Sequence, residues 1–416
     1  MRTLFTLAAA AILGCAPVEQ VKPELNAEVT ARQDSVDAIS PLRDFLYAKY
    51  DEQFGQKRDD LKELETKLDK ALKSVGISNE TIAVIKEGKP AYELREFFAK
   101  QGLLFRSINV PGMNFAVSYE LIRQGPKEQK EMTLFGITKK YTKTRILESI
   151  VDNAVAYQNK KKNAGLVEHG YMYGTDNIEY RAWKHDKTAR AYFEGEKQYG
   201  KELEEEAANP KQLAEKYSET KQALFSRMGT ILHHIGVRDL SNIKIFEEFE
   251  KKMKPVWERD SEIHDVMYSI DVFDFEKDAI SKLTTKNKKR LSTEYTVHLK
   301  VRAMLAQLYH SESPHDRLGD LFKAASGEGL AYEVLAATTV LNVFRLAVLS
   351  ERERFGNIDF VVGDAIYAQF CRLTTDQIKQ LALATFKGTY QERPLKDYME
   401  KVLGKIINEQ KKTEFY

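Results

Sequence analysis

The sequence contains little cysteine and little net charge. Its 416 residues include two cysteines, Cys15 and Cys371, which is too few for a disulfide scaffold or a four-cysteine zinc site. The fold must therefore depend on a hydrophobic core. The 64 Lys and Arg residues nearly balance the 62 Asp and Glu residues, giving a formal net charge of +2. Because no global field attracts a polyanion, we predict no nucleic-acid partner.

Several short catalytic motifs are also missing. The sequence contains neither His-Glu-x-x-His nor Gly-x-Ser-x-Gly, and it has no phosphate-binding glycine loop. These patterns mark zinc proteases, serine hydrolases and nucleotide-binding enzymes respectively. No catalytic residue and no cofactor is assigned on this basis, so a protein that acts by binding is favoured over an enzyme.

The first fourteen residues have the layout of a secretory signal peptide. Arg2 provides a positive charge, the run from Leu4 to Leu13 is apolar, and Gly14 is a small residue at the expected cut. The apolar run is too short to span a bilayer permanently. The segment Ile12-Leu-Gly-Cys15 resembles the lipobox of bacterial lipoproteins, in which an aliphatic residue and a small residue precede a cysteine.

The lipobox resemblance implies that Cys15 carries a diacylglycerol, and that the new amine carries a further acyl chain such as palmitate. Two or three chains, at about 0.8 kcal/mol per buried CH₂, hold a protein on a membrane where one chain would be marginal. Ala16 rather than Asp at the next position implies the outer membrane of a Gram-negative cell, facing the periplasm or the surface. The alternative is an ordinary signal peptide, cut after Gly14 or Ala16.

Behind this leader the sequence predicts an all-α, irregular multi-helix bundle. Residues 15–40 are polar and include Pro17 and Pro23, which indicates a lipidated flexible tether. The helical domain is expected over residues 41–416, with any subdivision near 200–210. Apolar residues at three- and four-residue steps predict its helices. The expected ranges are about 61–75, 79–87, 115–122, 138–160, 211–234, 242–258, 261–282, 375–386 and 394–410, while residues 103–110 fit an extended segment.

The most apolar stretch runs from Leu330 to Leu349 and is long enough to raise the question of a membrane span. Glu333, Asn342 and Arg345 lie within it. Charged side chains at that depth of a bilayer are costly. We therefore predict a central core helix, against which residues 358–370 and 375–386 pack.

Three groups of histidines raise the alternative of a metal- or haem-dependent enzyme. His233 and His234 are adjacent, His264 and Asp265 follow about thirty residues later, and His185 precedes both groups. Two helices that brought imidazole and carboxylate groups together would provide the ligands of a zinc or iron site. Adjacent residues of a helix point about 100° apart, so a single metal would take only one of His233 and His234.

Two resemblances give this alternative more definite forms. The segment Ile231-Leu-His-His-Ile-Gly236 is similar to the Leu-Leu-His-Asp-Ile-Gly core of the HD phosphohydrolases, an all-helical metal-dependent family. However, His234 stands where that family has its metal-binding Asp, and its earlier His has no counterpart here. The segment from Phe225 to Trp257 is similar to part of the latex-clearing haem oxygenases, which implies His185 as the nearest candidate axial ligand, although no complete ligand motif matches.

The segment from His169 to Tyr199 is unusually rich in aromatic residues. Among them, Tyr171, Tyr173, Tyr180 and Trp183 lie among glycines and charged residues. Exposed rings of this kind bind peptides or glycans with little loss of entropy; alternatively, they cover one side of a helical core. We therefore predict a lipid-anchored helical envelope protein that binds or scaffolds an envelope protein or peptidoglycan, with these four residues as the contact surface.

Overall fold

A computed structural model describes residues 22–414, apart from residues 54, 90, 109–117, 153, 155–156, 158–169, 174–176, 241–244, 274, 329–330, 352 and 360–362. The described chain is predominantly α-helical, which confirms the predicted fold class. It forms two compact units. The smaller holds the described residues up to Arg123 together with those of 149–158, and the larger holds residues 124–148 and the described residues after 158.

The smaller unit is built mainly from helices. They are α1 (Lys22–Gln53), α2 (Leu61–Ser74), α3 (Asn79–Lys86) and α4 (Tyr92–Ala99). The helix predicted at about 61–75 is confirmed as α2, in which Leu64, Leu68 and Leu72 are buried along one face. Ser78 caps α3 by accepting a hydrogen bond from the backbone N–H of Thr81, which satisfies one of the free donors at the start of that helix.

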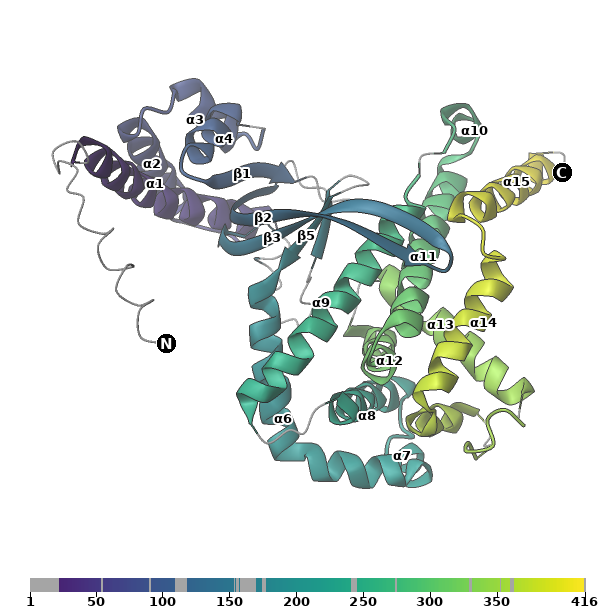
Figure 1. The fold of residues 1–416 in the computed structure, drawn as a ribbon. Helices are drawn as coiled ribbons and strands as arrows, with labels where there is room; N and C mark the ends of the chain where they lie inside the picture. The colour runs from purple at the N-terminus through teal and green to yellow at the C-terminus, as the bar shows by residue number, and fades with distance from the viewer. Residues whose placement is uncertain are drawn as a thin grey trace, which may run out of the picture. The chain divides into compact units, whose positions relative to one another are not determined.

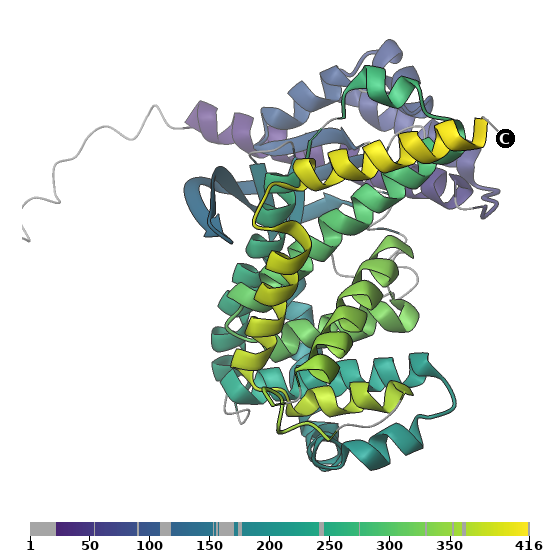
Figure 2. The same ribbon diagram turned by 90° about the vertical axis from the view of Figure 1, so that its right-hand side faces the viewer.

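The larger unit contains the remaining helices (Figures 1 and 2). They are α6 (Ala182–Ala208), α7 (Pro210–Lys216), α8 (Lys221–Leu240), α9 (Phe246–Asp271), α10 (Lys277–Ser281), α11 (Thr285–His310), α12 (Pro314–Lys323), α13 (Ala331–Ser350), α14 (Thr375–Tyr390) and α15 (Leu395–Glu414), with a π-helical turn η1 (Ala324–Glu328) and a 3₁₀ segment η2 (Gly363–Arg372). The expected core helix of residues 330–349 is α13, and the expected last two helices are α14 and α15.

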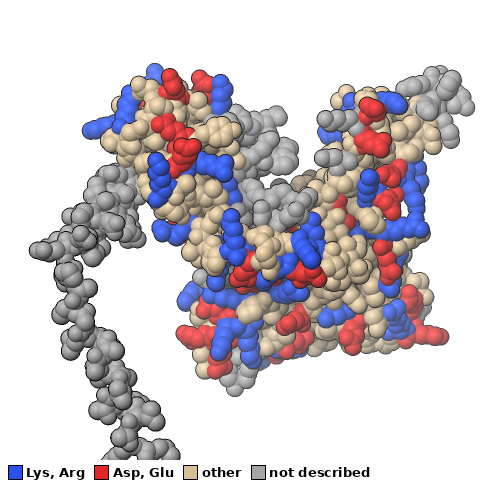
Figure 3. Space-filling view, turned by 45° about the horizontal axis from the view of Figure 1, so that its top comes forward, with Lys and Arg blue, Asp and Glu red and all other residues tan. Residues whose placement is uncertain are grey.

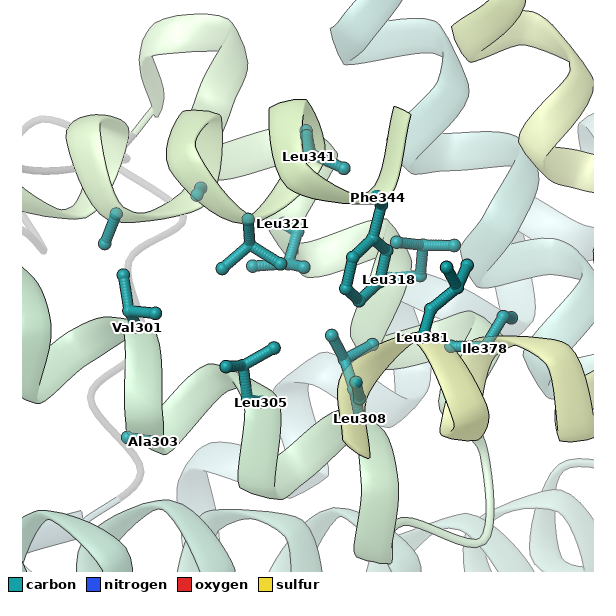
Figure 4. Close-up of a cluster of buried hydrophobic side chains, with 14 of the residues drawn as sticks. Val301, Ala303, Leu305, Leu308, Leu318, Leu321, Leu341, Phe344, Ile378 and Leu381 are labelled. Atoms are coloured by element: carbon teal, nitrogen blue, oxygen red, sulfur yellow. The ribbon is translucent and has the colours of Figure 1, made fainter. Parts of the chain in front are cut away.

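The core of the larger unit lies where α11, α12, α13 and α14 meet. In Figure 4, Leu305 and Leu308 of α11 face Leu321 of α12, Phe344 of α13 and Leu381 of α14. All five side chains are buried. Fully burying one such side chain contributes about 1.5–3 kcal/mol, so this junction holds the four helices together.

A five-stranded sheet corrects part of the helical prediction. Its order is β1-β2-β3-β5-β4. The strands are β1 (Leu103–Ile108), β2 (Ser118–Leu134), β3 (Ile137–Val151), β4 (Gly170–Tyr173) and β5 (Asn177–Arg181). The extended segment expected at residues 103–110 is β1, which pairs antiparallel with β2. The helices expected at 115–122 and 138–160 were wrong where β2 and β3 stand.

The turn between β2 and β3 explains that error. Phe135 and Gly136 have φ angles of 49° and 82°, and two successive positive φ angles are typical of the tight turns that join antiparallel strands. In the next strand, Ile137 and Tyr141 lie four residues apart and mimic a helical stripe. The β-branched residues between and after them favour a strand, and pairing with β2 decides the outcome.

Further boundaries also differ from those predicted. Helix α1 begins at Lys22, inside the segment expected to be a flexible tether at residues 15–40. The helices expected at 242–258 and 261–282 are joined in one continuous helix, α9, which ends at Asp271 and passes through Pro255. The boundary between the compact units lies at residues 123, 148 and 158, whereas residues 200–210 fall within the larger unit.

Candidate functional site

Several buried polar side chains lie where α8, α9 and α12 of the larger unit meet (Figure 1). Helices α8 and α12 approach closely because glycines line their contact. A Cβ atom on Gly236 would lie 2.5 Å from the backbone nitrogen of Asp316, and one on Gly319 would lie 2.9 Å from the carbonyl oxygen of Gly229. Real Cβ atoms do not come so close, so the absence of side chains permits this crossing.

Asp316 of α12 is the centre of the group. Its buried carboxylate accepts hydrogen bonds from Nδ1 of His233 on α8 at 2.6 Å and from Nε1 of Trp257 on α9 at 2.9 Å. The guanidinium of Arg317 also donates to it. Burial by itself would raise the pKa of Asp316, but the charge of Arg317 and the bond from His233 hold that pKa below its ordinary value. Asp316 therefore stays ionised and joins three helices.

Arg317 connects Asp316 to two further carboxylates. Its Nη1 lies 2.6 Å from Oδ2 of Asp320, and its Nε lies 3.2 Å from Oδ2 of Asp260. The hydroxyl of Ser311 donates to the same Asp260 oxygen at 2.8 Å. A single guanidinium thus faces three acids, and their pKa values move apart: the pKa of Asp316 is lowered, whereas burial raises those of Asp260 and Asp320.

Asp260 is a buried acid of this group with a raised pKa. Burial raises its pKa to about 7, although the charge of Arg317 and the bond from Ser311 act in the opposite direction. Its other oxygen, Oδ1, has no hydrogen-bond partner among the described residues. A buried carboxylate with one unpaired oxygen is costly to ionise, so protonation near pH 7 follows from its position.

His233 is oriented by Asp316. Because the ionised carboxylate accepts at Nδ1, the imidazole donates there and presents Nε2 on its other side, where Oδ1 of Asp320 lies 3.6 Å away. The ring of Tyr192 on α6 packs edge-on against that of His233, with their centroids 5.4 Å apart. A carboxylate that fixes the orientation of a histidine is common both in catalytic pairs and behind metal ligands.

The structure places the other predicted histidines apart from His233. Nδ1 of His234 pairs with Oε2 of Glu196 on α6 at 2.5 Å, so the two adjacent histidines contact different helices. On α9, His264 contacts its neighbour Asp265 at 3.0 Å. Within the described ranges, no three His, Cys, Asp or Glu side chains are grouped so that they could hold a metal ion. The side chain of His185, on α6, lies outside the described residues.

The predicted aromatic surface falls largely outside the described side chains. Tyr171 and Tyr173 belong to β4, Tyr180 to β5 and Trp183 to α6, but their rings are not among those described. Two later rings of the same segment can be placed. Phe193 is buried against Phe249, and Tyr192 packs on Trp257. These two rings therefore cover a core instead of forming a free surface.

Cys371, in η2, has the properties expected of an inert thiol. Burial raises its pKa to about 12, and its Sγ contacts the carbonyl oxygen of Ala368 at 3.0 Å. A thiol with so high a pKa has almost no thiolate at neutral pH and reacts slowly. Cys15, the predicted site of lipid attachment, lies outside the described residues.

One helix presents apolar side chains to solvent. Among the described residues, α13 is the helix that is long and apolar enough to cross a membrane by length and composition, yet 33% of its most apolar window is buried. Its Leu341 and Phe344 point into the core (Figure 4), whereas Leu335 and Leu346 are 51% and 64% exposed. The predicted core helix is thus buried on one face only.

Charge is distributed evenly over the surface that can be seen. On the faces of both units shown in Figure 3, basic and acidic side chains are intermingled. This agrees with the small net charge of the sequence. No long-range attraction toward one sign of partner is expected from these faces.

Sequence reasoning missed most of the buried polar group. Asp316 lies 83 residues from His233, and no fixed spacing connects them. One signal was available: the segment Ser311-Glu-Ser-Pro-His-Asp-Arg317 places many polar residues just before the apolar part of a helix.

Comparisons of the chain with protein-family models, with curated proteins and with solved structures found no match.

Proposed function

We propose that this protein is a lipid-anchored helical envelope protein that acts by non-catalytic binding or scaffolding, and that the outer face of α13 is its contact surface. The lipobox resemblance at Ile12-Leu-Gly-Cys15 supports the anchor. In a Gram-negative cell, Ala16 favours the outer membrane. The body of the protein would then stand at the membrane surface, facing the periplasm or the cell exterior.

The observation that carries the binding function is the exposure of Leu335 and Leu346. They lie eleven residues apart on α13, which is about three helical turns, so both side chains project from one side of the helix. Each is more than half exposed. Large apolar side chains that a folded domain leaves exposed along one side of a helix are candidates for contact with other molecules, and a helix face of this kind suits a protein partner better than a glycan.

The buried polar group supports the same function in a different way. The hydrogen bonds of Asp316 tie α8 and α9 to α12, and α12 packs against α13 through Leu321 and Leu341 (Figure 4). A surface held in place before binding loses less conformational entropy when a partner arrives. Helix α13, which presents Leu335 and Leu346, therefore packs against a helix that hydrogen bonds hold in place.

Photo-crosslinking in cells tests this proposal. A benzophenone amino acid is placed at Leu346 of the full chain, and at Leu147 in a matched control. Leu147 is a leucine of similar exposure, 49%, in β3. Binding through α13 predicts a discrete covalent adduct from position 346 and none from position 147. Equal yields from the two positions, or no adduct from position 346, would rule out α13 as the contact surface.

A metal-dependent enzyme is the second candidate function, because one observation favours it. His233 donates from Nδ1 to Asp316 and has Oδ1 of Asp320 near its Nε2, which is how many metal-binding histidines are oriented. Catalytic zinc sites use three protein ligands, so His233 and Asp320 would need a third. Metal analysis of the purified full chain tests this candidate: stoichiometric zinc or iron that is lost in His233→Ala would support it.

A further inference from the structure

We infer that the occupant of the α13 face is a second copy of this chain, which pairs with the first through α13 to form a homodimer. This inference rests on the proposed binding function, because it names the partner of the same surface. It is carried by a seam of five residues on the outer side of α13. We define the α13 seam as Leu335, Thr339, Asn342, Leu346 and Leu349.

The spacing of the seam is that of a helix that packs on another helix. Its members follow one another at steps of four, three, four and three residues, the alternation that keeps one line of side chains facing a partner in a coiled coil. Leu335, Thr339 and Leu346 are exposed, whereas Asn342 and Leu349 are half-buried and Leu349 also packs in part against the core. The opposite side of α13, including Leu341 and Phe344, is used by the core (Figure 4). In Figure 2, α13 lies on the near side of the larger unit.

The seam itself carries no charge. Of the charged side chains of α13, Glu333 pairs with Lys300 of α11 at 3.2 Å. Nε of Arg345 is buried without a hydrogen-bond partner among the described residues. Two copies of the seam therefore meet without opposing like charges. An interface between identical molecules related by a two-fold axis must be its own complement, and an uncharged seam with leucines at both ends meets that requirement.

Asn342, at the middle of the seam, gives the pairing its specificity. The hydroxyl of Tyr367 donates to Oδ1 of Asn342 at 2.7 Å, which fixes the orientation of the amide. The Nδ2 group is left to donate, and no described residue accepts from it. Across a two-fold axis, each Asn342 can donate from Nδ2 to the second lone pair of Oδ1 on the other copy. In coiled coils, a single buried asparagine in an apolar seam fixes the register of the helices and the number of helices that associate.

The amide of Asn342 makes lipid a poor occupant. At the middle of the seam the hydroxyl of Thr339 already donates to the carbonyl oxygen of Leu335 at 2.7 Å, but Nδ2 of Asn342 would find no acceptor in hydrocarbon. Moving an unpaired amide into an apolar medium is costly. A facing helix with the same asparagine provides an acceptor instead. The composition of the seam thus favours protein over membrane, and an identical seam over an unrelated one.

Disulfide trapping in membranes tests the inference on the full chain. In a Cys371→Ser background, Asn342→Cys places one thiol at the predicted centre of the interface, and mild oxidation should give a reducible band at twice the mass of the chain. Thr339→Cys is a second variant on the same seam. Two controls should remain monomeric: the background chain, which also reports any free Cys15 thiol, and Ser292→Cys on an exposed part of α11.

A further variant ties the result to the seam. Leu346→Glu introduced beside Asn342→Cys places two like charges in the interface and should lower the disulfide yield at least tenfold. Leu147→Glu should leave the yield unchanged. Monomer alone from both seam cysteines would overturn the inference. So would a photo-adduct from position 346 whose mass is that of the chain plus a lipid or a different protein, although the second of these would leave the proposed binding function standing.

Discussion

Arg302 and Asp271 form an ion pair with both side chains fully buried: Nε of Arg302 donates to Oδ2 of Asp271 at 2.6 Å. The guanidinium also donates to the carbonyl oxygen of Arg393 and lies over the ring of Phe386, 4.6 Å from its centroid. The pair therefore joins α9 and α11 to α14 and to the start of α15. Arg302 is the largest fully buried side chain among the described residues.

Breaking this pair on one side should destabilise the protein strongly. We expect Asp271→Asn or Arg302→Met to lower the free energy of unfolding by about 3–5 kcal/mol, because each leaves a buried group without its partner. Chemical denaturation, followed through the unfolding transition of the larger unit, measures the loss of unfolding free energy. The double variant Asp271→Leu, Arg302→Met should recover most of it, since it removes both charges. A double variant no more stable than the singles would contradict this account.

Asp260 should make stability depend on pH in the range from about 4 to 7. Its pKa is raised to about 7 in the folded state, whereas an unfolded Asp titrates near 3.9. Between these values the folded state holds a proton that the unfolded state lacks. The contribution of this group to the free energy of unfolding therefore falls as the pH rises through this range, by a few kcal/mol in total, and is constant above pH 7.

Asp260→Asn provides the measurement for that prediction. The amide cannot ionise, so the difference in unfolding free energy between wild type and variant should change with pH between about 4 and 7 and level off above 7. Denaturation at several pH values gives this difference directly. Ser311→Ala is a useful companion, because it removes the hydrogen bond at 2.8 Å that favours ionised Asp260, and it should move the dependence to higher pH. A difference that does not vary with pH would show that Asp260 is ionised throughout.

The anchor can be tested by one substitution. We expect Cys15→Ser to release the protein from the membrane fraction, because the acyl chains are attached through that sulfur in the lipobox family and hold the protein by burying CH₂ groups. Cys371→Ser should leave the protein with the membranes. Fractionation followed by mass measurement of the mature chain reads out both. An unmodified thiol at Cys15 in the wild-type chain would contradict the anchor.

The helices and the sheet were not equally predictable from sequence. The stripe of Leu64, Leu68 and Leu72 predicted α2 because a helix brings residues three and four apart onto one face, so a local pattern contains the answer. The β2–β3 hairpin depends on pairing between two strands, which the pattern of either strand alone does not show, and on a turn at Phe135 that the usual Asn-Gly or Asp-Gly signal does not mark. The ring of Phe135 stacks on Phe386 at 3.7 Å, a contact that no local pattern reveals.

The buried polar group around Asp316 was also predictable only in part. His233 was visible as a chemically unusual residue, and its divergence from His234 followed from helix geometry. Its partner Asp316 was not predicted, because the two lie 83 residues apart. Asp271 and Arg302 likewise pair although they lie 31 residues apart, on different helices. The sequence identifies residues whose side chains can ionise or bind a ligand, whereas the packing of helices decides which of them meet.

The close crossing of α8 and α12 predicts that a side chain added at Gly236 destabilises the protein. Ala at Gly236 would place a Cβ atom 2.5 Å from the backbone nitrogen of Asp316 and 2.6 Å from Oγ of Ser313. Because backbone cannot move aside as a flexible side chain can, we expect Gly236→Ala to separate the helices and lower the free energy of unfolding by about 1–3 kcal/mol. The hydrogen bond between His233 and Asp316 should lengthen with them.

Gly388, inside α14, is the matched control for that substitution. A Cβ atom on Gly388 meets nothing within 4 Å, and Ala is favoured over Gly within a helix by about 0.5–1 kcal/mol. Gly388→Ala should therefore stabilise the protein while Gly236→Ala destabilises it, although both make the same chemical change in a helix. Thermal and chemical denaturation compare the two. If Gly236→Ala is as stable as Gly388→Ala, the close crossing that brings His233 to Asp316 does not exist in solution.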